Sequence, residues 1–240
     1  MSKNDNPKTV AEARATIQTL EAEVERLKNP AWPKAAPGCG VLLHYTDADG
    51  QPFILYSERG TEHGKGYGIT GGGFFSVKKA LPYPKDYIKS AVHNVVLTHE
   101  QEAFRELCEE FRDQGQDENE NDTFEEVQGK ATAFVNILTF SRFFHLSERI
   151  CGFVVRTPHD PHNQYHDCNF FSCEVSEGEA QALLAIPGNA ERPKTVALPA
   201  NKASMEHVIE RLFHAHEAEP IKLLAQYLIA KQQLSDAGIL

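Results

Sequence analysis

Short runs of β-forming residues alternate with helical segments along most of this chain. The predicted strands cover residues 41–45, 53–57, 133–140, 150–156, 169–175 and 195–198. Helical spacing of apolar residues marks the segments 176–185, 204–216 and 220–234. This order is not typical of a helix bundle or of an all-β sandwich, and it predicts a mixed α/β or α+β fold with a helical C-terminus.

The first 29 residues form a segment of a different kind. Apolar side chains recur at alternating steps of three and four between Val10 and Leu27, which predicts a helix with the seam spacing of a coiled coil. The helix either pairs with its copy in a homodimer or docks on its own domain. Pro30 ends it, and the proline-rich residues 30–38 predict a linker to a domain that covers residues 39–240.

Turn residues and glycines follow the first predicted strand. The sequence from Asp47 to Gly50 predicts a hairpin turn between residues 41–45 and 53–57. Glycines are then dense between Gly64 and Gly73. Because glycine has no side chain, its backbone can come close to a helix or to a phosphate group.

The acidic charge of the chain is concentrated in one window. Residues 100–126 contain twelve acids against Arg105 and Arg112, which accounts for the whole net charge of −10. This charge argues against non-specific nucleic-acid binding.

No apolar run reaches the roughly 18 residues of a membrane span, and the N-terminus lacks the apolar core of a signal peptide. The five cysteines are too few for a disulfide scaffold, and their number is odd. This cysteine content indicates a reducing compartment, so we expect a cytoplasmic protein.

One helix in this window carries the candidate chemistry. Thr98 and Gln101 form a capping-box pattern, which predicts a helix over residues 99–113. Glu106, Glu109 and Glu110 have i, i+3 and i+4 spacing, so their carboxylates share one helical face. A divalent cation relieves the repulsion among them, and Mg²⁺, which takes one or two carboxylates together with water and phosphate oxygens, suits this set. The alternative is a solvated acidic face.

Two stretches of the chain resemble the signature of the Nudix hydrolases. The hexapeptide RELCEE from Arg105 to Glu110 is similar to its R-E-U-x-E-E core, where U is a bulky aliphatic residue. The sequence ITGG, which ends at Gly72, resembles the strand end and glycine pair that open the signature. The chain departs from the family in a long insertion between the two stretches, in Leu97 at the first signature glutamate, and in Arg112 at the closing glycine.

The resemblance implies a Nudix-like α/β/α sandwich with a mixed sheet, to which the N-terminal helix is an addition. It also implies hydrolysis, with Mg²⁺ or Mn²⁺, of the pyrophosphate bond of a nucleoside diphosphate linked to another moiety. The substrates that are common in this family favour a molecule like ADP-ribose or a dinucleotide. The expected partner is therefore a nucleotide-derived small molecule.

The implied roles follow the matching positions. Glu106, Glu109 and Glu110 would hold the metal, and one of them, or a glutamate from another loop, would act as the base. Arg105 would orient the helix glutamates by ion pairing, with Glu109 as its expected partner. The remaining candidates are the glycines Gly71 and Gly72 at the substrate, Glu191 as a further metal ligand, and Arg59 as a phosphate contact or an ordinary surface arginine.

Two other functions fit the sequence. The departures from the signature suit a catalytically weak or silent Nudix fold that binds a nucleotide as a regulator. A chain without Nudix chemistry would be an interaction module that oligomerises through its N-terminal helix and has a solvated acidic helix. A position of Glu106, Glu109 and Glu110 far from Gly71–Gly73 would favour this second alternative.

Overall fold

A computed structural model describes residues 35–61, 64–74, 99–117, 119, 122–156, 165–189, 192, 194–212 and 214–239. The described residues all belong to one compact unit that begins at Ala35. The predicted N-terminal helix and the capping residue Thr98 lie outside the described residues. None of the described helices is long and apolar enough to cross a membrane.

A seven-stranded mixed sheet forms the middle layer of the fold. The first four strands are β1 (Ala35–Thr46), β2 (Pro52–Thr61), β3 (Gly64–Ile69) and β4 (Gly71–Phe74). The later strands are β5 (Ser147–Arg156), β6 (Tyr165–Glu174) and β7 (Lys194–Pro199). The strand order is β3-β2-β1-β6-β5, while β4 pairs with β1 and β7 pairs with β2. The β1–β6 pair is parallel and the other pairs are antiparallel.

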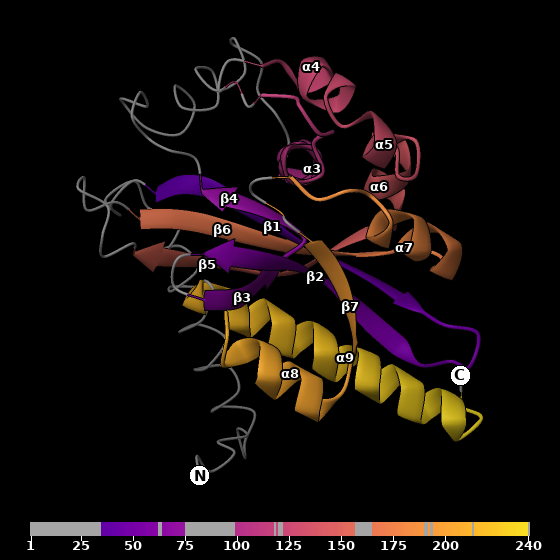
Figure 1. The fold of residues 1–240 in the computed structure, drawn as a ribbon. Helices are drawn as coiled ribbons and strands as arrows, with labels where there is room; N and C mark the ends of the chain where they lie inside the picture. The colour runs from indigo at the N-terminus through magenta and orange to yellow at the C-terminus, as the bar shows by residue number, and fades with distance from the viewer. Residues whose placement is uncertain are drawn as a thin grey trace. The chain divides into compact units, whose positions relative to one another are not determined.

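Helices cover both faces of this sheet (Figure 1). On one face lie α3 (His99–Glu110), α4 (Phe124–Gly129), α5 (Thr132–Val135), α6 (Phe140–Leu146) and α7 (Glu177–Leu184). On the other face lie α8 (Lys202–Ile209) and α9 (Ala218–Asp236), with the short 3₁₀ helix η1 (Ala215–Glu217) before α9. The predicted α/β/α sandwich with a mixed sheet and a helical C-terminus is therefore confirmed.

The sandwich follows from the alternation of side chains along the buried strands. On β1, Val41 and Leu43 pack into the apolar cluster beneath α3, while Leu42 between them packs into the cluster beneath α9. All three side chains are fully buried. Because successive residues of a strand point to opposite faces, a continuous apolar run such as this one requires a layer of helices on each side.

Several predicted boundaries differ from the structure, among them that of the helix predicted over residues 204–216, which forms α8 only as far as Ile209. Strand β1 begins at Ala35, so residues 35–38 are strand and not linker. Residues 133–140, predicted as strand, contain most of α5 and the first residue of α6. The buried residues Phe134 and Leu138 are four apart, and the amide of Leu138 donates to the carbonyl of Phe134 at 2.9 Å. The apolar run thus has helical periodicity, because one helical face packs on the aromatic core around Phe104.

Candidate functional site

Helix α3 lies close to the sheet because strand β4 begins with a glycine. A Cβ atom at Gly71 would lie 2.6 Å from Cδ2 of Leu107 and 3.2 Å from its Cα. Only glycine leaves room for the helix backbone at this distance. Gly71 pairs with Val41 on β1, so the contact places the RELCEE helix directly over the centre of the sheet. The acidic helix and the glycine strand are therefore neighbours.

Arg105 is the centre of the charged group on α3. Its guanidinium forms ion pairs with Glu102, at 2.8 Å, and with Glu106 and Glu109. The Arg105–Glu109 pair is the one expected from the i, i+4 spacing. Glu102 was not predicted as part of the group, although its i, i+3 spacing to Arg105 was a usable signal. Three carboxylates around one guanidinium leave an excess of negative charge.

Burial strengthens the repulsion among these carboxylates. Glu106 is 7% exposed, and this burial raises the pKa of its carboxyl well above the ordinary value. Arg105 opposes the rise, whereas Glu109, Glu102 and Glu110 add to it. Burial alone would lower the pKa of Arg105, but the surrounding glutamates raise it well above its ordinary value. Since the repulsion among the carboxylates is only partly compensated, a further cation at this face would be stabilising.

The donor set fits a hard divalent cation. Glu106, Glu109 and Glu110 offer carboxylate oxygens, the ligand type that Mg²⁺ and Mn²⁺ prefer. Within the described part of the chain, no three His, Cys, Asp or Glu side chains already form a metal-binding cluster. Mg²⁺ does not require such a cluster, because it commonly takes one or two carboxylates and completes its shell with water and substrate phosphate.

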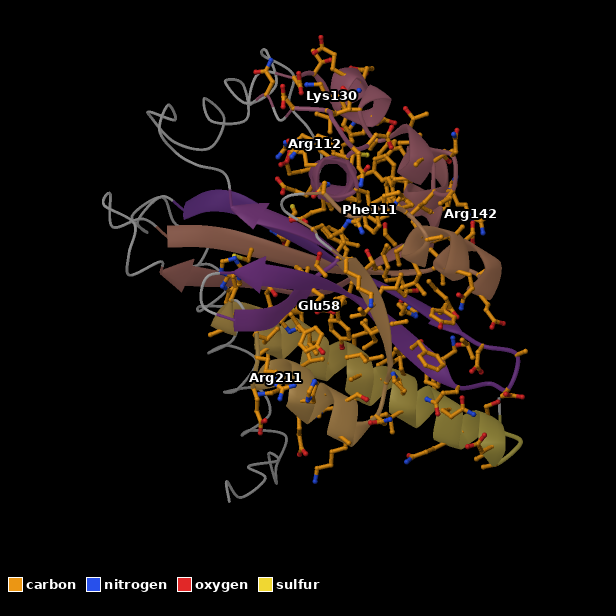
Figure 2. The ribbon with its side chains drawn as sticks, viewed as in Figure 1. Glu58, Phe111, Arg112, Lys130, Arg142 and Arg211 are labelled. Carbon is orange, nitrogen blue, oxygen red and sulfur yellow. The ribbon has the colours of Figure 1, made fainter. Side chains whose placement is uncertain are left out.

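The chain before β7 holds the C-terminal end of α3. Arg192 is fully buried, and its Nε donates to the carbonyl of Glu110 at 3.0 Å. The side-chain amide of Asn189 donates to the same carbonyl at 2.9 Å. The guanidinium carbon of Arg192 lies 4.0 Å from the ring centroid of Phe111, which Figure 2 shows at α3. Burial lowers the pKa of Arg192 to about 10, and Glu110 counteracts that shift.

This contact was not predicted. A single arginine before a short strand has no pattern that distinguishes it from a surface residue. The helix was expected to reach residue 113, yet α3 ends at Glu110, where these two side chains satisfy its terminal carbonyl. Arg112, at the position of the closing signature glycine, is buried beside the same helix end.

The remaining predicted site residues are placed only in part. Glu191 lies outside the described residues, although its neighbour Arg192 contacts the end of α3. Gly72 pairs with Gly40 on β1, in the strand that α3 covers. The backbone of Arg59 pairs with Gly66 in the β2–β3 hairpin, and its side chain lies outside the described atoms.

Comparisons with known proteins give structural matches only. No family model and no curated protein matches the chain. The solved structures that resemble it include a C. elegans Ap4A hydrolase, with 10% identity, a TM-score of 0.41 and coverage of 81% of this chain and 98% of that one. A mutT/nudix family protein from Listeria innocua has 15% identity, a TM-score of 0.42 and coverage of 83% and 97%. The NUDIX domain of Shewanella oneidensis NrtR, complexed with ADP ribose, has 13% identity, a TM-score of 0.42 and coverage of 87% and 98%.

Proposed function

We propose that this chain is a Nudix-type hydrolase that cleaves the pyrophosphate bond of a nucleoside diphosphate linked to another moiety, with Mg²⁺ or Mn²⁺. The observation that carries the proposal is the group of glutamates around Arg105, of which Glu102 and Glu106 are buried, on a helix packed against the glycine strand β4. An acidic surface helix would not bury Glu106 and Glu110 to 7% exposure. The RELCEE motif of this helix supports the same assignment.

In this proposal the residues of α3 have distinct roles. Glu106 and Glu110 hold the cation, with Glu109 as a further ligand, and Glu191 is a candidate ligand from the segment before β7. When bound there, such a cation would supply charge neutralisation at the pyrophosphate and would lower the pKa of a water molecule. One of the α3 glutamates accepts the proton of that water. Arg105 positions Glu106 and Glu109 by ion pairing, so both carboxylates are oriented before the substrate binds.

The glycines and Arg59 belong to the substrate side of the proposal. Gly71 and Gly72 allow close approach of the backbone at β4, and Arg59 is a candidate phosphate contact on β2. The preferred substrates are like ADP-ribose or a dinucleotide, and their hydrolysis would occur in the cytoplasm.

We also propose a homodimer that forms through the N-terminal helix. Deletion of residues 1–30, followed by measurement of the solution mass, tests this proposal.

A substrate screen with matched variants tests the enzyme proposal. We expect Mg²⁺-dependent or Mn²⁺-dependent cleavage of at least one compound from a panel of ADP-ribose, dinucleoside polyphosphates and nucleoside diphosphate sugars. Glu110→Gln and Glu106→Gln should reduce kcat by at least a hundredfold. Glu125→Gln, an exposed acid of the same window, is the control and should retain full activity. If the wild type binds nucleotides without hydrolysing any of them, the regulatory alternative is correct.

A further inference from the structure

Small side chains form a row across the sheet beside α3. Gly73 on β4 pairs with Cys39 on β1, Cys39 pairs with Asn169 on β6, and Asn169 pairs with Gly152 on β5. Directly paired residues point to the same face of a sheet. Because Cys39 belongs to the apolar cluster beneath α3, this small-residue row lies on the α3 face.

The row begins next to the carboxylates of the candidate site. Burial raises the pKa of the Cys39 thiol well above its ordinary value, and the charges of Glu102 and Glu106 add to the shift. Cys39 also pairs with Gly73 on β4, the strand in which Gly71 contacts Leu107 of α3. The β4–β1 end of the row is therefore the part closest to α3 and to the proposed metal site.

The row ends at an arginine on the edge strand. A Cβ atom at Gly152 would overlap Nη2 of Arg149 and would lie 3.1 Å from Oδ1 of Asn169. The guanidinium of Arg149 thus lies across the bare backbone of Gly152, next to Asn169. Any larger residue at position 152 would displace it.

A β-bulge produces this arrangement. Arg149 and Gly152 are three residues apart, and in a regular strand they would point to opposite faces. The register of β5 shifts between Arg149 and Cys151, so Arg149 pairs with Phe171 and shares its face with Gly152. Bulges often direct a side chain in this way beside functional sites.

Both polar groups at this end have unused donors. Among the described carboxylates, none forms an ion pair with Arg149, whose side chain is exposed. Asn169 is 2% exposed, and its Nδ2 has no hydrogen-bond partner. A buried donor without an acceptor has a free-energy cost in the folded state. A bound acceptor group would remove this cost.

We propose that Arg149 and Asn169 form an anion subsite that binds a phosphate group of the substrate, separate from the bond that is cleaved. The inference rests on the proposed function, which places the reacting pyrophosphate at α3. Strands β1 and β5 are two strand spacings apart, or about 10 Å. The subsite therefore suits a substrate that carries a second phosphate some distance from the first, as a dinucleotide does. The Arg149 guanidinium provides the planar, multiple hydrogen bonding that phosphate oxygens accept, and a turn of the Asn169 amide, whose Oδ1 lies toward Gly152, adds the donor Nδ2.

Calorimetric titration of the full chain with AMP in the presence of EDTA tests the subsite without the metal. We expect Arg149→Ala to weaken AMP binding at least tenfold, and Arg149→Lys to weaken it less because the charge remains. Gly152→Ala retains every charge but places a methyl group where the guanidinium lies, so it should also weaken binding about tenfold. Adenosine, which has no phosphate, should bind equally to all variants. Arg211→Ala, which removes a cation on the opposite face of the sheet, is the matched control (Figure 2).

Asn169→Asp provides a second test with an isosteric side chain. The new carboxylate would pair with Arg149 and repel phosphate, so AMP binding should be lost while the melting temperature shows a folded chain. Wild-type affinity in Arg149→Ala and Gly152→Ala, or an equal loss in Arg211→Ala, would overturn the subsite. If Arg149 controls AMP binding but the wild type hydrolyses no pyrophosphate, the subsite stands and the proposed enzyme function fails.

Discussion

The guanidinium carbon of Arg192 lies 4.0 Å from the ring centroid of Phe111, directly after the last turn of α3. Phe111 in turn stacks on Phe134, with ring centroids 4.8 Å apart. Through these contacts, the segment before β7 packs against the end of α3 and against the aromatic core. This contact makes the end of α3 a part of the fold and not a frayed terminus.

Replacing Arg192 should destabilise the whole domain. Arg192→Ala removes the stacking on Phe111 and the donor to the Glu110 carbonyl, and it leaves a cavity. We expect a loss of about 3 kcal/mol in the free energy of unfolding, measured in urea. Arg192→Lys retains the charge without the planar guanidinium group, and it should lose less of the free energy of unfolding. A change below about 0.5 kcal/mol in Arg192→Ala would show that the contact is incidental.

The close contact between Gly71 and Leu107 predicts non-additive mutational effects. Gly71→Ala places a methyl group against Leu107, so we expect a loss of about 1–3 kcal/mol in unfolding free energy. In the double variant with Leu107→Ala, the overlap with the leucine side chain is removed and only the close approach to the Cα atom of residue 107 remains, so the combined loss should be smaller than the sum of the single losses. Gly129→Ala, where nothing lies within 4 Å of the new methyl group, should be neutral or stabilising. Simple additivity would contradict the contact.

His44 should make the fold sensitive to acid. Burial lowers the pKa of this imidazole to about 4, with Lys231 lowering it further and Glu174 opposing the shift. The unfolded chain, with a histidine pKa near 6.5, binds the proton more readily, so stability falls as the pH drops from about 6.5 through 4. The complete effect is about 3 kcal/mol. Urea unfolding at pH 7 and at pH 4 should show a smaller acid loss in His44→Leu, and an equal loss would exclude His44 as the cause.

Divalent cations should stabilise the folded chain through α3. We expect Mg²⁺ to raise the melting temperature of the wild type, because a ligand that binds only the folded state stabilises it by mass action. The shift should disappear in Glu106→Gln and Glu110→Gln, and EDTA should reverse it. Glu125→Gln serves as the control and should retain the shift. Equal shifts in all four proteins would indicate general screening of charge rather than a site on α3.

Local patterns in the sequence were sufficient for several elements. The hairpin turn predicted at residues 47–50 forms, with Oδ1 of Asp47 accepting hydrogen bonds from the amides of Asp49 and Gln51, and with Gly50 at a φ of 82°. The helix predicted at residues 176–185 forms as α7 behind a capping box of Ser176 and Glu179. These features depend on bonds between residues close in sequence, so composition and spacing determine them.

Within the candidate site, the sequence by itself determined the carboxylates of α3 and the Arg105–Glu109 pair, because helical periodicity places side chains four residues apart next to each other. Only the tertiary structure decided which groups meet across long separations. Arg192 reaches Glu110 over 82 positions, and the β-bulge brings Arg149 to the face that carries Asn169. Such contacts depend on strand register and on packing between layers, which no local pattern encodes.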